Sequence, residues 1–379
     1  MRLRCERIVT PSGVIGGEVA IEGGRIASVT AQPQPGGGDA LDLGAQWLAP
    51  GFIDTHVHGG AGAQCNTADP EEVDAVAAFH ALHGTTALLA TTVAAPLDEL
   101  AASLEAISRS GPSVLGAHLE GPFLSPQRPG AMDPAAFIDP DPDAVARLLE
   151  AGAGSLAMMT LAPELPGAPE LVTALGRAGA IASIGHSDAT YEQAEVSVAA
   201  GARSVTHLFN AMRPFHHRDP GVIGVALDLP LLSCELICDG VHVDPVALRV
   251  AYRAKGTAGA RLVTDAIEAA GMADGRYLLG RAPVDVSGGV ARVGGGESLA
   301  GSTLTMDTAV RHAVEFLDVP PSEAIAMASR NPARLLGIAD RKGAIAAGLD
   351  ADLVVLDDEL DCRATMVAGE WITGPPASH

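Results

Sequence analysis

Histidine and carboxylate side chains lie at the ends of several apolar, β-branched segments of this chain, and they offer the chemistry of a divalent-metal site. Imidazole and carboxylate groups bind zinc and related ions, and a catalytic site leaves one coordination position open for water. The polar residues at these segment ends are His56, His58, Glu120, His186, His207, Asn210, Asp239, His242 and Asp265. Barrel and sheet interiors are normally lined by valine, isoleucine and leucine, so the whole set indicates a functional site.

Two groups of these residues could bind metal ions. His56 and His58 have the spacing that turns both imidazoles to the same side of a strand, roughly 6–7 Å apart along the chain. Glu120, His186 and His207 supply one carboxylate and two imidazoles, which is a complete catalytic ligand set. We therefore expect one or two divalent ions; zinc is the foremost candidate, and iron, manganese and cobalt also accept these ligands.

Asp265 ends the last of the apolar segments and is the candidate general base. A metal ion can lower the pKa of bound water to about 7. A nearby carboxylate can then take a proton during attack and return it to a leaving amine. These residue types therefore predict a hydrolase.

The chain lacks the lysine that bridges the metal ions of some binuclear barrel hydrolases at the end of the fourth strand. The corresponding segment here ends Leu161-Ala162-Pro163-Glu164, and the only lysines are Lys255 and Lys342. We therefore expect no lysine bridge, which leaves Glu120 as the acidic ligand.

The apolar segments alternate with stretches of helical spacing, such as residues 70–84 and 188–201, and this alternation predicts parallel strands joined by helices. Eight such segments predict an α/β protein with a (β/α)8 TIM-like barrel over residues 50–342 and a site at the carboxyl ends of its strands. A doubly wound sheet is the alternative, but GGAGAQ at 59–64 lacks the third glycine and the later acidic residue of a nucleotide-binding fingerprint. The eight predicted strands are 52–58, 85–93, 114–121, 156–163, 180–187, 204–210, 234–240 and 261–267.

Both ends of the chain contain short alternating strands separated by glycine-rich turns. We predict that residues 1–49 and 343–379 form one small β-sandwich domain, with the barrel inserted between its two parts.

The composition excludes several classes of partner and location. With 24 Lys+Arg against 46 Asp+Glu, the formal net charge is −22, which argues against a nucleic-acid or anionic-membrane partner. No apolar run approaches the roughly 18–20 residues of a membrane helix, and MRLRCERIVT lacks a secretory core. The 5 cysteines are scattered, so we expect free thiols and a cytoplasmic protein.

Seven motifs occur in an order and spacing that resemble the N-acetylglucosamine-6-phosphate deacetylases of the amidohydrolase superfamily. PGFID-x-H-x-H alone marks the superfamily, whereas HLEGPF, THLFNAM and DGxHVD together are much more specific. The motifs are PGFIDTHVHGG (50–60), HLEGPFLSP (118–126), GHSDATY (185–191), THLFNAM (206–212), DGVHVD (239–244), LVTDA (262–266) and LAGSTLTM (299–306).

The resemblance implies hydrolysis of N-acetyl-D-glucosamine 6-phosphate to D-glucosamine 6-phosphate and acetate, in amino-sugar catabolism and recycling. By motif position, Glu120, His186 and His207 would be metal ligands, His56 and His58 would add a second ion, and Asp265 would transfer the proton. His242 would polarise the amide carbonyl, and Arg218 would hold the phosphate, within a subunit or across a homodimer. The residues expected to contact substrate are Ala131, Met132, Asn210, Ala211, Arg218, His242, Leu299, Ala300 and Gly301.

One position departs from the family pattern. The segment that usually ends Gly-Ala-His reads Gly130-Ala131-Met132, so a thioether replaces a hydrogen-bond donor. The open alternatives are hydrolysis of another N-acyl amino sugar, a cyclic amide or a dipeptide, or a catalytically inactive barrel that serves as a scaffold. The lack of a bridging lysine and the presence of Arg218 disfavour a cyclic amide or a dipeptide as the substrate. An inactive scaffold is disfavoured by the complete set of Glu120, His186, His207 and Asp265.

Overall fold

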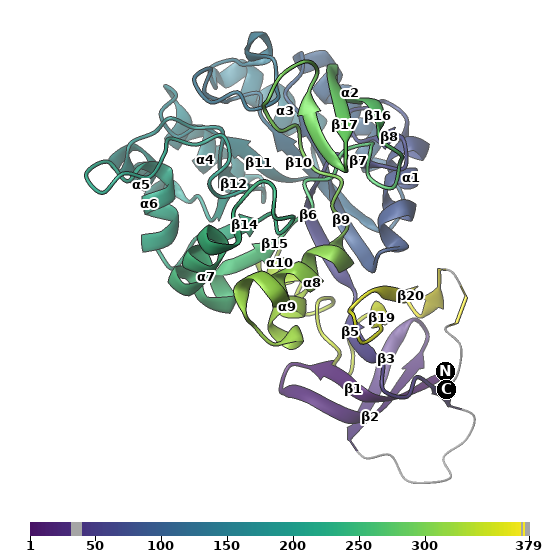
Figure 1. Ribbon diagram of the computed structural model, residues 1–379. Coiled ribbons are helices and arrows are strands. Elements are labelled where there is room, and N and C mark those ends of the chain that lie inside the picture. Colours follow the sequence, from purple (N-terminus) through teal and green to yellow (C-terminus); the bar gives the residue numbers. More distant parts are fainter. Residues whose placement is uncertain (32–39, 373, 376–379) are drawn as a thin grey trace.

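A parallel barrel surrounded by helices forms the larger part of the protein, and a second sheet lies below it (Figure 1). The computed structural model describes residues 1–31, 40–372 and 374–375. None of the helices in these ranges is both long enough and apolar enough to cross a lipid bilayer.

The barrel sheet contains eight strands in the order β15-β14-β13-β12-β11-β10-β9-β6, and all its ladders are parallel. The chain that follows β15 closes the barrel against β6, because the amide of Asp265 donates to the carbonyl of His56 at 2.8 Å. All eight predicted strands are confirmed. They are β6 (Phe52–Val57), β9 (Thr85–Val93), β10 (Val114–Glu120), β11 (Leu156–Leu161), β12 (Ile181–Ile184), β13 (Ser204–Val205), β14 (Ser233–Leu236) and β15 (Ala260–Leu262).

Helices cover the outside of the barrel, and their starts follow from local sequence signals. Asp69 caps α1 by accepting from the amide of Glu71, and Thr190 and Gln193 form a capping box at the start of α5. The helices are α1 (Pro70–Ala81), α2 (Leu97–Ser108), α3 (Pro142–Ala151), α4 (Ala168–Arg177), α5 (Tyr191–Ala200), α6 (Gly221–Asp228), α7 (Pro245–Gly259), α8 (Met306–Leu317), α9 (Pro321–Ala328), α10 (Arg330–Leu335) and the 3₁₀ helix η1 (Pro134–Ala136).

Both ends of the chain contribute to the second eight-stranded sheet, as the sequence predicts. Its order is β21-β20-β19-β5-β1-β2-β3, with β4 paired to β1, and its strands enclose an apolar cluster separate from that of the barrel. The ladder between β5 and β19 joins the two ends. The strands are β1 (Arg2–Thr10), β2 (Gly13–Glu22), β3 (Arg25–Ala31), β4 (Leu41–Asp42), β5 (Trp47–Pro50), β19 (Leu353–Leu356), β20 (Cys362–Val367) and β21 (Glu370–Trp371).

Two small β elements near the mouth of the barrel are absent from the predicted topology. Strands β16 (Gly275–Leu279), β17 (Ala282–Ser287) and β18 (Val290–Val293) form an antiparallel sheet between β15 and α8. The two-residue strands β7 (Gly59–Gly60) and β8 (Ala63–Gln64) form a hairpin directly after β6. The larger insert matters for function because Leu279, at the end of β16, lines the cavity described next.

Candidate active site

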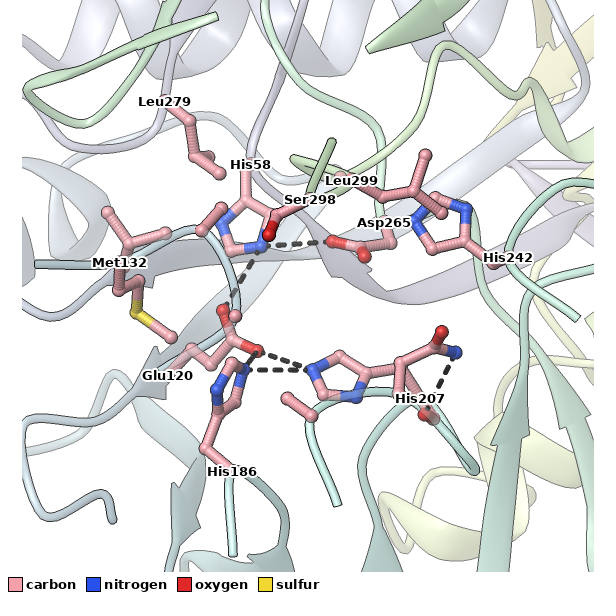
Figure 2. Close-up of a pocket in the computed structure, with 16 residues that line it drawn as sticks. His58, Glu120, Met132, His186, His207, His242, Asp265, Leu279, Ser298 and Leu299 are labelled. Carbon is pink, nitrogen blue, oxygen red and sulfur yellow. Dashed lines mark hydrogen bonds and ion pairs between the residues drawn. The ribbon is translucent and has the colours of Figure 1, made fainter. Parts of the chain in front are cut away.

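A cavity of about 270 Å³ opens at the carboxyl ends of the barrel strands (Figure 2). Most of the predicted site residues line it. Val93, Gly130, Leu279 and Ser298 complete the lining. The predicted residues in the lining are His58, Glu120, Ala131, Met132, His186, His207, Asn210, Ala211, His242, Asp265, Leu299 and Gly301.

Glu120, His186 and His207 meet at the base of this cavity as the first group of possible metal ligands, and all three are buried. Oε1 of Glu120 lies 3.0 Å from Nε2 of His186 and 2.9 Å from Nε2 of His207. The two Nε2 atoms are 3.1 Å apart. Three ligand atoms from segments distant in sequence therefore converge on one point.

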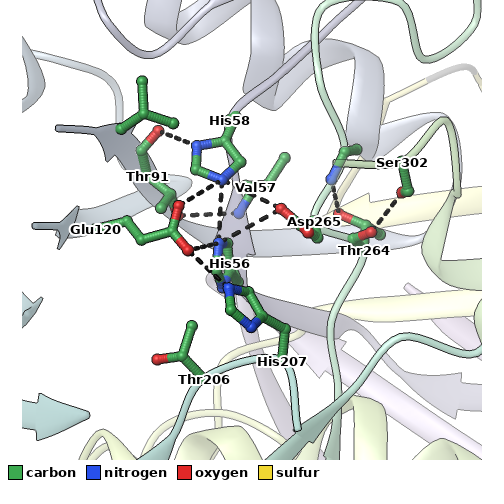
Figure 3. Close-up of polar contacts among 12 residues, drawn as sticks. His56, Val57, His58, Thr91, Glu120, Thr206, His207, Thr264, Asp265 and Ser302 are labelled. Atoms are coloured by element: carbon green, nitrogen blue, oxygen red, sulfur yellow. Dashed lines mark hydrogen bonds and ion pairs between the residues drawn. The ribbon is translucent and has the colours of Figure 1, made fainter. Parts of the chain in front are cut away.

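His56, His58 and Asp265 form a second group beside the first (Figure 3). Nε2 of His58 lies 3.2 Å from Oδ1 of Asp265 and 3.4 Å from Oε2 of Glu120. His56 lies beneath His58, fully buried, and is not part of the cavity lining. Glu120 thus directs one carboxylate oxygen toward each group.

Three residues of these groups have a left-handed backbone, which is uncommon for residues other than glycine. The φ angles are 46° at His186, 28° at His207 and 51° at Asp265. The predicted sixth strand ends early at Val205 because the chain turns here to direct the His207 side chain inward. Such strained positions cluster at functional sites because surrounding contacts hold them.

Backbone carbonyls fix the orientation of two of the imidazoles. Nδ1 of His58 donates to the carbonyl of Thr91 at 3.1 Å, and Nδ1 of His186 donates to the carbonyl of Arg128 at 2.9 Å. A carbonyl only accepts, so Nδ1 carries the proton and Nε2 is the atom directed into the cavity. The unprotonated Nε2 of His186 then faces the carboxylate of Glu120. Because both groups present lone pairs, they attract each other only through a proton or a metal ion that lies between them.

The electrostatics of the site favour such a positive charge. Burial alone would raise the pKa of Glu120, but the His186 and His56 imidazoles lower it well below its ordinary value. Burial would lower the pKa of His56, yet the Glu235, Asp265 and Glu120 carboxylates raise it to about 10. Carboxylates and imidazoles at this spacing fit a divalent metal ion, which would satisfy the facing ligand atoms together.

His242 lies on the opposite wall of the cavity from Glu120 (Figure 2), and Asp239 orients its ring. Nδ1 of His242 lies 2.6 Å from Oδ2 of Asp239, whose other oxygen accepts from the backbone amides of Val241 and His242. Burial would raise the pKa of Asp239, but the hydrogen bond from His242 lowers it overall. The Nε2 edge of the ring remains for substrate.

Arg218 and Ala300 are predicted to contact substrate but do not line the cavity in this chain. Arg218 is exposed, and its guanidinium lies 3.1 Å from Nε2 of His217. Ala300 is fully buried in an apolar cluster behind the cavity wall. Met132 does line the cavity, and its sulfur accepts from the amide of Ala94 at 3.3 Å.

A buried layer of polar residues lies below the site, and the sequence does not predict its charged pair, Glu235 and Arg261. Glu235 and Arg261 form an ion pair at 2.8 Å with both side chains fully buried. Nδ1 of His118 donates to the carbonyl of Thr55, and Nε2 lies 2.8 Å from Oγ1 of Thr160. Both ring nitrogens of His118 are therefore occupied, and His118 with Glu235 belongs to a hydrogen-bonded network. The only sequence signal was a lone charge inside an apolar run, as in SCELIC (233–238).

Comparison with known proteins assigns the chain to a family. The amidohydrolase family model matches residues 47–372, and a model of the allantoinase composite domain matches residues 3–37. Bos taurus N-acetylglucosamine-6-phosphate deacetylase is 40% identical over 385 residues, which covers 97% of this chain and 94% of that protein. An Escherichia coli N-acetylgalactosamine-6-phosphate deacetylase is 39% identical and covers 97% of this chain and 98% of its own.

The similarity extends to solved structures. A mutant Mycobacterium smegmatis N-acetyl-D-glucosamine-6-phosphate deacetylase in complex with N-acetyl-D-glucosamine-6-phosphate superposes with a TM-score of 0.95. It is 41% identical to this chain, and the match covers 98% of this chain and 99% of that one. D-hydantoinase, at 14% identity and a TM-score of 0.63, shares the fold alone. This chain therefore belongs to the N-acetylglucosamine-6-phosphate deacetylase family of the amidohydrolases.

Proposed function

We propose that this protein is a metal-dependent deacetylase that hydrolyses N-acetyl-D-glucosamine 6-phosphate to D-glucosamine 6-phosphate and acetate, in amino-sugar catabolism and recycling. The observation that carries the proposal is the meeting of Glu120, His186, His207 and Asp265 in one cavity. The substrate follows from the family, since the Mycobacterium smegmatis relative is in complex with this phosphosugar.

Glu120, His186 and His207 would hold the principal metal ion, and His56 and His58 would hold a second. When bound, such an ion supplies Lewis-acid polarisation and lowers the pKa of water. Zinc is our first choice, because borderline-soft zinc suits a mixed imidazole and carboxylate set.

Asp265 would transfer the proton. Burial would raise its pKa, but the neighbouring His56 and His58 imidazoles lower it overall, so the carboxylate is ionised and able to accept a proton. It would take a proton from the attacking water and deliver it to the amine as the carbon–nitrogen bond breaks. The hydroxyl then remains on the acetyl carbon, and acetate and the amino sugar leave.

His242, oriented by Asp239, would contact the acetyl oxygen through its free Nε2 edge. Asn210, Ala211, Leu299 and Gly301 would surround the sugar, and Met132 would present an apolar surface to it. Ala300, buried behind the cavity wall, would hold the turn that places Leu299 and Gly301 against the sugar.

Arg218 would bind the phosphate of a substrate held in the neighbouring subunit of a homodimer. Arg218 is exposed and does not line the cavity of its own chain, which supports this arrangement. A guanidinium fork suits a phosphate group. The free state of all five cysteines supports a reducing compartment such as the cytoplasm.

Acetate release from purified, zinc-loaded protein tests the proposal. N-acetylglucosamine 6-phosphate, the same sugar without phosphate and N-acetylgalactosamine 6-phosphate are compared at equal concentration. We expect the first to give the highest kcat/KM and the non-phosphorylated sugar the lowest. No acetate from either phosphosugar would overturn the proposal, and a preference for the galactose epimer would reassign the substrate.

A further inference from the structure

The carboxylate of Glu235, on β14, contacts a member of each of the two ligand groups described above. Its Oε2 lies 2.9 Å from Nδ1 of His56, in the second group. The same oxygen accepts from the backbone amide of His207, in the first group, at 3.0 Å. Glu235 is fully buried and does not line the cavity, so it cannot touch the substrate.

Arg261 holds the other oxygen of this carboxylate. Its Nη2 donates to Oε1 of Glu235 at 2.8 Å and to Oγ of Ser204 at 2.9 Å. Its Nε donates to Oγ1 of Thr55 and its Nη1 to Oγ of Ser233. Because three hydroxyls and one carboxylate surround this fully buried guanidinium, the carboxylate has a fixed orientation.

The contact with His56 determines which ring nitrogen faces the site. An ionised carboxylate only accepts hydrogen bonds, so Nδ1 of His56 is the donor. Its Nε2 then points toward His58, whose Nε2 is 3.1 Å away. Carboxylates that accept from the far nitrogen of a metal-binding histidine are a recurrent means of orienting the ring.

The contact with His207 acts through the backbone. His58 and His186 each donate from Nδ1 to a carbonyl, but Nδ1 of His207 is buried without a hydrogen-bond partner among the residues that the structure describes. The direction of this ring therefore depends on its strained backbone, with φ of 28°. Glu235 holds that backbone by accepting from its amide.

We propose that Glu235, held by Arg261, is the positioning residue common to both ligand groups, and that it sets the metal affinity of the site. The inference rests on the proposed function, in which these groups bind metal ions. One carboxylate thereby links the ring of His56 to the backbone of His207.

The test uses substitutions at Glu235 with and without Arg261. In Glu235→Gln, the amide oxygen must face the Arg261 guanidinium, so the NH2 group faces His56 and the His207 amide. We expect the affinity for the weakest-held zinc ion to fall about 10- to 100-fold. Adding Arg261→Met frees the amide to turn, so that its oxygen again accepts from both residues. The zinc affinity of this double variant should therefore lie within about threefold of the wild-type value.

Zinc content after equilibrium dialysis against a chelator of known affinity is the readout, with circular dichroism to verify folding. Thr160→Val is the matched control: Thr160 is equally buried in the same layer, and its side chain forms hydrogen bonds with His118 and Thr206 but with no proposed ligand. Its zinc affinity should stay unchanged. If Glu235→Gln does not fold, Glu235→Leu/Arg261→Met, which leaves no buried charge and no acceptor, should show the same loss.

The outcomes separate this inference from the proposed function. Unchanged zinc affinity in both Glu235→Gln and Glu235→Leu/Arg261→Met overturns the positioning role while wild-type deacetylation continues. An equal loss in Glu235→Gln and in Glu235→Gln/Arg261→Met, or in Thr160→Val, also overturns it, because a general loss of packing then explains the effect. Failure of the zinc-loaded wild type to release acetate overturns the function, and its zinc affinity still reports on Glu235.

Discussion

The Nε2 atoms of His56 and His58 lie 3.1 Å apart, and both rings are oriented by hydrogen bonds at Nδ1. Glu235 accepts from His56, and the carbonyl of Thr91 accepts from His58. In their neutral forms, both rings would therefore present a lone pair to the other across this short distance. A cation between or above them removes the repulsion, and the nearby carboxylates of Glu120 and Asp265 favour its charge.

Replacement of Glu120 by glutamine should lower both zinc content and deacetylation. The amide keeps the shape of the side chain but removes the charge that lies within 3.0 Å of His186 and His207. We expect at least about a tenfold loss of zinc affinity, measured by metal analysis after dialysis. Full zinc content with normal turnover would contradict the ligand role. Glu99→Gln, on the surface of α2, serves as the control.

Replacement of both His56 and His58 by asparagine should reduce the zinc content from two ions toward one per chain. The change removes both imidazoles of the second group and leaves Glu120, His186 and His207 in place. Metal analysis of protein with its folding verified by circular dichroism measures the ratio. An unchanged ratio would show that this pair does not bind metal.

Arg218→Ala should raise KM for the phosphorylated sugar much more than it lowers kcat. A contact remote from the reacting bond persists in the ground and transition states alike, so its loss weakens binding in both. The loss should cost on the order of 2–3 kcal/mol. Steady-state kinetics with and without the phosphate on the sugar measures the effect, and Arg177→Ala, exposed at the end of α4, is the control. Equal impairment with both sugars would remove the phosphate role.

Asp265→Asn should lower kcat by about 10²–10⁴-fold, the usual contribution of a general acid–base group. The amide keeps the shape of the side chain but cannot accept the proton from water. Substrate binding should persist, as measured by calorimetry with the unreacted phosphosugar. Near-normal kcat in a variant that retains zinc would move the proton-transfer role elsewhere, with His242 the next candidate.

His80 should make the protein less stable in mild acid. It is fully buried on α1, its Nε2 donates to the carbonyl of Gly59 at 2.9 Å, and burial lowers its pKa to about 4. In the unfolded chain the pKa of His80 is near 6.5. Between pH values of about 4 and 6.5, His80 therefore binds a proton in the unfolded chain but not in the folded protein. The free energy of unfolding therefore falls as the pH falls through this window, by about 2 kcal/mol between pH 7.5 and 5.

Urea unfolding of the metal-free protein at both pH values measures this contribution. His80→Gln keeps a donor for the Gly59 carbonyl and removes the titration, so part of the acid-induced loss should disappear. Equal pH dependence in wild type and His80→Gln would contradict the prediction.

The sequence was sufficient to predict the barrel strands and most of the cavity lining, because the segments are apolar and β-branched and six of the eight have a histidine or a carboxylate at the carboxyl end. Residues such as His186 and Asp265 are visible for this reason. Glu235 and Arg261 are not, since a single charge within an apolar run has a partner only after distant strands are brought together. The sheet of β16–β18 was also missed, because its short strands lack the apolar length of the barrel segments.

The ladder between β5 and β19 has a consequence for the order in which the protein can fold during synthesis. Residues 47–50 pair with residues 353–356, and almost the whole barrel is translated between these two segments. Until β19 leaves the ribosome, β5 has an unpaired edge, which is the kind of surface that pairs with other chains. The nascent chain therefore has an unpaired strand edge throughout synthesis of the barrel. That edge, on β5, is covered only when β19 is made and pairs with it.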